Sequence, residues 1–502
     1  MRWALLALAA ITAPAPAHGE WLRAKSRHFV IYSDTGESEL RALATRLERF
    51  DAAVRRIYGF PDRDEDAANP LTVYVADSVS AVEKLCGCSN IAGFYQPRAT
   101  GAIAFTPRIG SDGGVFGLRP QTVLFHEYGH HLLFANSAAA VPAWFAEGSA
   151  ELISTATVDA DKVTIGHAAN HRAYGLLHSQ QLPLTVLFAP NRRLSDRERD
   201  QLYGRGWLLT HYATFNPQRA EQMKRYLAAF ATGTPPLQAA KDAFGDLGKL
   251  DRELGNYLRG RLFGAGVPVS TLPAATVELR PLSRGEQALI DMRMVSERGV
   301  NPKTAAPLYA RARKVSVPAD DAVAQAWLAE MAFDAGQDAE AEAAADRALA
   351  ADPRSIHALL YKARIRLRRA VAARSADPKI WSEARSWIVK ANRVENNHAG
   401  ALQLYYQSFE MANVKPSATA ANGLRRALEL VPQDPGLRFA VARQNLVDGR
   451  TADARRTLMP LAYSPHAAPD NPAARLIALI DQGKTGEAAL AAIAPELAAE
   501  TK

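Results

Sequence analysis

Residues 120–151 read PQTVLFHEYGHHLLFANSAAAVPAWFAEGSAE, and this stretch indicates the fold of the domain that contains it. It contains an HExxH pattern formed by His126, Glu127 and His130. Residues four apart lie on one face of a helix, so the two histidines can bind one metal ion. Glu127 can accept a proton from a water that this ion activates. The apolar pairs at 123–124 and 132–133 predict that the helix is buried.

A third metal ligand is expected downstream, because a catalytic zinc ion needs three protein ligands and one open position. Glu147 lies 17 residues after His130, which allows one helix to end and a second helix to return beside it. Pro142 suits the first turn of that second helix. Glu151 lies one turn beyond Glu147 on the same face, where its carboxylate can orient a ligand imidazole through the second ring N–H.

These residues resemble the gluzincin metallopeptidases, in which HExxH is followed by a spacer of a little under twenty residues and then a glutamate ligand. The block at 144–151, WFAEGSAE, is most similar to the peptidase MA-like branch, whose pattern is approximately W-(L/F)-x-E-G-x-A-E. The resemblance implies that zinc is held by His126, His130 and Glu147. It also implies that Glu127 is the general base. The 16-residue spacer is slightly shorter than in the best-known members, which predicts a trimmed loop.

A donor to the developing oxyanion is usual in gluzincins, and Tyr203 is the first choice for it here, with ordinary helix packing as the alternative. His211 and Tyr174 are weaker candidates. Tyr128 belongs to a different helix face from the ligands, and His131 is expected to support the site or the core. A short strand at 102–105 is either an edge strand that binds an extended peptide or an internal strand.

Residues 18–265 are expected to form one α+β domain. Strands are predicted at 28–33 and 71–76, an amphipathic helix at 36–57, a hairpin at 155–165 and helices throughout 200–262. A joint rich in glycine and proline, 266–283, is interpreted as a linker.

The segment 284–498 changes in composition to dense alanine without convincing strands. Small residues recur with a period near 34, as in tetratricopeptide repeats. One unit contains about nine inserted residues relative to this period. Five or six helical hairpins are therefore expected, with a generic helical bundle as the alternative. Such arrays offer a surface for a peptide or protein partner.

The first 17 residues have the features of a signal peptide: a basic start, a short apolar run and an A-x-A site ending at Ala17. We therefore expect a periplasmic or secreted protein without a membrane span. Cys86 and Cys88 can form a disulfide, remain free thiols or contact a metal ion. The net charge of +8 comes from dispersed basic residues, and no nucleic-acid motif is present.

The sequence thus predicts an α+β gluzincin-like metallopeptidase domain followed by an all-α tetratricopeptide-like solenoid. The expected function is zinc-dependent hydrolysis of a peptide or protein substrate, with the solenoid binding a protein partner. A catalytically silent zinc-containing scaffold is the main alternative, and zinc-dependent hydrolysis of a non-peptide substrate is another.

Overall fold

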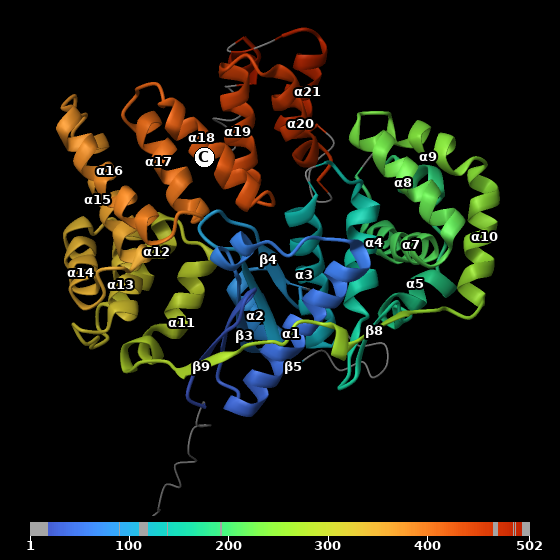
Figure 1. Ribbon diagram of the computed structural model, residues 1–502, viewed down its shortest axis with the longest axis horizontal. Helices are drawn as coiled ribbons and strands as arrows, with labels where there is room; N and C mark the ends of the chain where they lie inside the picture. The colour runs from blue at the N-terminus through green and yellow to red at the C-terminus, as the bar shows by residue number, and fades with distance from the viewer. Residues whose placement is uncertain are drawn as a thin grey trace, which may run out of the picture.

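The computed structural model describes residues 19–89, 91–109, 119–137, 139–190, 193–464, 470–484, 486 and 488–493 (Figure 1). The expected signal peptide at 1–17 lies outside the described residues. A six-stranded sheet forms the centre of the molecule, and its strands are ordered β4-β5-β3-β2-β1-β9. These strands are β1 (Leu22–Lys25), β2 (Phe29–Ser33), β3 (Leu71–Ser78), β4 (Phe94–Gln96), β5 (Ile103–Ile109) and β9 (Glu278–Pro281).

The central strands β2, β3 and β5 run parallel, and the outer pairs are antiparallel. The strands expected near 28–33 and 71–76 are therefore confirmed. The strand expected at 102–105 is internal, because β5 lies between β3 and β4. The edge next to it is β4, a strand of three residues that the sequence pattern did not predict.

Alternate residues of the strands pack on opposite faces of the sheet, as the pleat requires. Phe29, Ile31 and Val73 face α1 (Glu37–Tyr58) and α3 (Pro120–Asn136) in one core. Tyr32 and Tyr74 face a second core formed with α11 (Arg284–Arg298) and α13 (Ala322–Asp334). Helices from the C-terminal half therefore cover one face of the N-terminal sheet.

A second, three-stranded sheet is formed by the expected hairpin, β6 (Thr157–Val158) and β7 (Lys162–Ile165), together with β8 (Ala265–Pro268). The interpretation of 266–283 as a linker needs correction. This segment contains most of β8, which pairs with β7, and all of β9, which pairs with β1. Its glycine and proline content is typical of a linker, and its short strands could not be predicted locally because their pairing partners lie far away in the sequence.

The helical region expected at 200–262 is confirmed as four helices. They are α7 (Asp196–Phe215), α8 (Pro217–Ala231), α9 (Pro236–Phe244) and α10 (Leu247–Arg259).

The C-terminal part is a succession of paired helices that curves around the sheet domain (Figure 1). Besides α11 and α13, the helices of this part are α12 (Pro302–Ala312), α14 (Asp338–Ala351), α15 (Ile356–Ala372), α16 (Pro378–Val394), α17 (Ala399–Met411), α18 (Ala418–Leu430), α19 (Pro435–Val447), α20 (Thr451–Ala462) and α21 (Pro472–Asp481). Helix α15 begins 34 residues after α13, and α17 begins 43 residues after α15. The helical repeat and its inserted unit are thus present, and we call α11–α21 the array.

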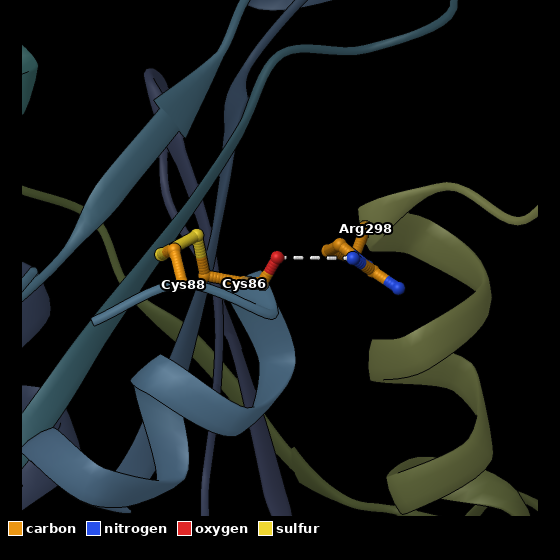
Figure 2. The surroundings of a disulfide bond; sticks show 3 residues. All are labelled: Cys86, Cys88 and Arg298. Atoms are coloured by element: carbon orange, nitrogen blue, oxygen red, sulfur yellow. Dashed lines mark hydrogen bonds between the residues drawn. A yellow bond between two sulfur atoms is a disulfide. The ribbon is translucent and has the colours of Figure 1, made fainter.

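The cysteine pair lies where the end of a short helix, α2 (Val79–Cys86), contacts the array. Cys86 and Cys88 form a disulfide, which resolves the three states left open by the sequence. The Cys86 carbonyl accepts a hydrogen bond from Arg298 Nη1 of α11 at 3.0 Å (Figure 2). Within the described residues, none of the helices has the length and apolar composition needed to cross a bilayer.

Candidate metal centre

Two adjacent helices carry the predicted ligands. Helix α3 contains His126 and His130, and α4 (Ala143–Ser154) contains Glu147. Gly129 allows the helices to cross closely, because a Cβ there would lie 3.2 Å from the Cα of Ala150. The middle of the HExxH pattern is therefore a helix contact as well as a spacer between ligands.

The three candidate ligand atoms form a nearly equilateral triangle. The Nε2 atoms of His126 and His130 lie 3.2 Å apart. The Glu147 Oε2 atom lies 3.4 Å from the first and 3.3 Å from the second. Glu147 is 1% exposed, so the helix α4 backbone holds its carboxylate in the protein interior.

This triangle fits a tetrahedral zinc ion. Zinc–ligand bonds of about 2.0–2.1 Å at tetrahedral angles place neighbouring ligand atoms about 3.3–3.4 Å apart. The observed separations of 3.2 to 3.4 Å agree with this value without rearrangement of the side chains. Two imidazoles and one carboxylate are also the ligand set of hydrolytic zinc sites.

Glu151 occupies the supporting position that the sequence predicts. Its Oε1 lies 3.6 Å from His126 Nδ1, on the far side of the ring from the ligand triangle. Glu151 is 1% exposed and is held by Arg172, whose Nη2 donates to Oε1 at 2.6 Å. His171 Nε2 lies 2.6 Å from the other oxygen. Arg172 in turn donates to Asp200 at 2.9 Å, so the carboxylate that faces His126 is fixed from two sides.

The carboxylates control the protonation of the site. Burial alone would lower the pKa of His126, but Glu147, Glu151 and Glu127 outweigh it and raise that pKa to about 9. Burial would raise the pKa of Glu147, yet the two histidines hold it well below its usual range. Burial likewise opposes the shift at Glu151, where Arg172 is the main cause of a lowered pKa.

A cleft of about 510 Å³ opens beside the ligands, and its lining includes His126, Glu127, His130 and Tyr203. The Tyr203 ring stacks on the His126 ring with centroids 6.1 Å apart, and the Arg172 guanidinium lies 4.8 Å from the Tyr203 ring centroid. Burial raises the pKa of Tyr203, which keeps its phenol protonated at neutral pH. The first-choice tyrosine therefore lies in the cleft as a neutral hydrogen-bond donor.

The weaker candidates lie elsewhere. His211 is fully buried and contacts Tyr257 Oη at 2.8 Å and the Gly166 carbonyl at 2.9 Å. Tyr174 is 75% exposed and does not line the cleft. Tyr128 donates to Asp51 at 2.6 Å on the sheet side of α3, in agreement with its expected separation from the ligands.

Several cleft residues were not predicted from the sequence. His171 and Arg172 belong to a single 3₁₀ turn (Asn170–Arg172), and only their polarity marks them in the sequence. Tyr95 comes from the edge strand β4 and hydrogen-bonds His131 Nδ1 at 3.0 Å. Burial lowers the pKa of His131 to about 3, so this histidine is a neutral supporting residue, as expected.

A second group of metal-ligand residue types, His28, Glu48 and Asp51, lies under the sheet side of α3. His28 Nδ1 hydrogen-bonds Glu48 at 2.8 Å, and Arg55 Nε donates to both Asp51 oxygens at 2.9 Å. The Tyr128 hydroxyl also binds Asp51. These contacts make the group a buried ion-pair network that anchors α3, in which His28 pairs with Glu48 and Arg55 pairs with Asp51.

No protein-family model matches the chain, and a comparison with curated proteins gives no match. Among solved structures, a thermophilic TPR protein from Thermus thermophilus is similar at 21% identity and a TM-score of 0.30, over 36% of this chain and 92% of its own. A likeness this distant carries no argument, so the function has to be inferred from the site itself.

Proposed function

We propose that the chain is a zinc-dependent metallopeptidase of the gluzincin type. The observation that supports this most is the triangle of His126, His130 and Glu147 atoms at zinc-ligand separations, with Glu127 in the same cleft. In this proposal the three residues hold the ion. A bound zinc ion would lower the pKa of a coordinated water and polarise a carbonyl group.

The remaining steps belong to the side chains of the cleft. The Glu127 carboxylate takes up a proton from the attacking water, holds it at one oxygen and delivers it to the leaving amine nitrogen. The Tyr203 hydroxyl donates a hydrogen bond to the scissile carbonyl oxygen as that oxygen gains negative charge. Glu151 keeps the His126 ring in its ligand orientation.

The edge strand β4 provides a binding surface for an extended peptide. Among the described residues it pairs with β5 alone, and Phe94 and Tyr95 line the cleft. An extended chain can pair with the free side of such a strand through main-chain groups alone. The substrate-binding role proposed for 102–105 therefore passes to β4. With the signal-peptide features of residues 1–17, this strand supports the proposal of an exported enzyme that acts on polypeptides.

Metal analysis combined with peptide cleavage tests the proposal. We expect about one zinc ion per chain in the wild type and in Glu127→Gln, and none in His126→Ala. His178→Ala, which changes an exposed helical histidine outside the cleft, is the control and should leave zinc in place. Only the zinc-containing wild type and this control should cleave members of a peptide library, as followed by mass spectrometry.

Three outcomes separate the alternatives. Absence of zinc from chelator-free wild-type protein would contradict the metal site. Zinc without cleavage of any peptide would contradict the peptidase and leave two alternatives, the scaffold, whose protein partner would then bind the array, and a hydrolase of a non-peptide substrate. Loss of cellular function in Glu127→Gln would argue for the enzyme, because that change leaves the ligands intact.

A further inference from the structure

The loop that follows the edge strand β4 inserts into the array. Ala99 is 2% exposed and belongs to a hydrophobic core whose other buried members all come from α17, α18, α19 and the α18–α19 turn. The neighbouring Thr100 packs against Gly400 of α17, where a Cβ would lie 3.0 Å from Thr100 Cγ2 and 3.2 Å from the Ala99 carbonyl oxygen. The loop after β4 is thus part of the array core.

A single carboxylate connects this loop to a helix of the array. Asp434, which is 9% exposed, begins α19 by accepting a hydrogen bond from Leu437 N at 2.8 Å through Oδ1. Its second oxygen accepts a hydrogen bond from the Ala99 backbone N–H at 2.6 Å, across 335 residues of sequence. Because both partners donate to an ionised group, these hydrogen bonds are stronger than neutral ones.

The other end of the strand faces the metal cleft. Tyr95 lines the cleft together with Glu127 and contacts His131, which follows the ligand His130. Only Gln96, Pro97 and Arg98 separate Tyr95 from Ala99. Arg98 adds a further link, since its Nη2 donates to the carbonyl of Arg298 in α11 at 3.0 Å.

The loop between the two ligand helices also contacts the array. Ala140, between α3 and α4, is 2% exposed and packs in a core formed mainly by α19, α20 and α21. Two segments that border the ligand helices, one after β4 and one after α3, are therefore both enclosed by the array.

We propose that the array supports the cleft from outside its lining, with Asp434 as a positioning residue that fixes edge strand β4 beside Glu127 and the ligand triangle. The effect of this positioning on substrate binding rests on the proposed peptidase function. The array thereby sets the position of the peptide-binding strand, in addition to any partner that it binds.

Asp434→Ala in the full chain tests this proposal, and Asp377→Ala is the matched control. Both aspartates precede a proline and begin an array helix through their side chains, but Asp377 caps α16 and contacts Lys379 N at 2.8 Å. The two variants therefore lose the same type of helix cap, and only one loses a contact with the sheet domain.

Hydrogen exchange followed by mass spectrometry should report faster exchange of the 94–101 segment in Asp434→Ala by about tenfold or more, as expected for loss of a charge-assisted hydrogen bond. Zinc content should stay at the wild-type level. For a cleaved library peptide, KM should rise severalfold with a smaller change in kcat, because a displaced strand weakens substrate binding. Asp377→Ala should match the wild type in all three measurements.

A second variant approaches the same loop from another helix. Gly400→Val should displace Thr100 and Ala99 and reproduce the exchange and KM changes. Gly423→Val should not, because its Cβ would meet only Leu402 Cδ2 at 3.7 Å. Equal exchange of 94–101 in Asp434→Ala and Asp377→Ala would overturn the positioning role. Failure of the wild type to bind zinc or cleave peptides would instead overturn the peptidase function, while the exchange data would still decide whether the array holds the strand.

Discussion

Glu151→Gln should weaken zinc binding by about 10- to 100-fold, which corresponds to about 1.4–2.7 kcal/mol. The glutamine keeps an acceptor near His126 Nδ1 but removes the negative charge that lies 3.6 Å from that nitrogen. Two unit charges at this distance interact by about 4.6 kcal/mol at an effective dielectric constant of 20. Since only about a third to a half of a unit charge develops on the ring N–H when the opposite nitrogen binds a cation, roughly 1.5–2.3 kcal/mol is lost.

The assay is competition for zinc between the protein and a chromophoric chelator at about pH 10, above the raised pKa of His126, so that a proton on this ring does not compete with zinc. The melting temperature of the metal-free protein is recorded in parallel. Asp200→Asn is the matched control, because it removes the other carboxylate to which Arg172 donates, at 2.9 Å, without changing the surroundings of the His126 ring. Its zinc affinity should stay within about threefold of the wild type, well below the roughly 10- to 100-fold loss expected when a group that supports a ligand is removed. Equal zinc affinities for Glu151→Gln and the wild type would refute the reasoning.

Further predictions concern protonation, packing and the hydroxyl donor. Because the pKa of His126 is raised to about 9, the metal-free site holds a proton at neutral pH that zinc must displace. The apparent zinc affinity should therefore rise about tenfold per pH unit up to pH about 9 and then level off, as measured by titration at several pH values. Gly148→Ala should lower the melting temperature by several degrees, since a Cβ there would overlap the Gly206 carbonyl of α7 and cost about 1–3 kcal/mol. The control Gly255→Ala, with only a side-chain atom at 3.8 Å, should be neutral or stabilising in the same thermal scan. Tyr203→Phe should keep its zinc and lose about 10²–10³-fold in kcat if the hydroxyl binds the oxyanion, and an unchanged kcat would assign the ring to packing alone.

The candidate ligand set could be predicted from the sequence because its geometry is local. His126, Glu127 and His130 lie within little more than one helical turn, and Glu147 and Glu151 repeat the same spacing on the next helix. Helical periodicity fixes these relations before any tertiary contact forms. The same reasoning predicted the array, whose helices begin 34 and 43 residues apart.

Tyr95, Arg172 and Asp434 could not be predicted, because long-range packing brings each of them to its partner. Tyr95 lies on a strand of three residues, too short for an alternating pattern to emerge. Arg172 lies in a single turn 21 residues beyond Glu151, and tertiary packing rather than local spacing brings the two side chains together. Asp434 has the sequence context of an ordinary helix cap, and nothing local distinguishes it from Asp377.

The distribution of charge in the cleft explains why metal binding should be coupled to a proton. Glu147 and Glu151 are each 1% exposed, and Arg172 forms an ion pair with Glu151 but not with Glu147. A buried carboxylate requires nearby positive charge, and in the metal-free site the carboxylates raise the pKa of His126 to about 9 against the effect of burial. A divalent cation on the same nitrogen would take over this role and release the proton. Zinc binding at neutral pH should therefore release about one proton from His126, measurable as a buffer-dependent heat of binding. A heat that is the same in buffers of different ionisation enthalpy would mean that His126 is already neutral and that the carboxylates do not govern the site.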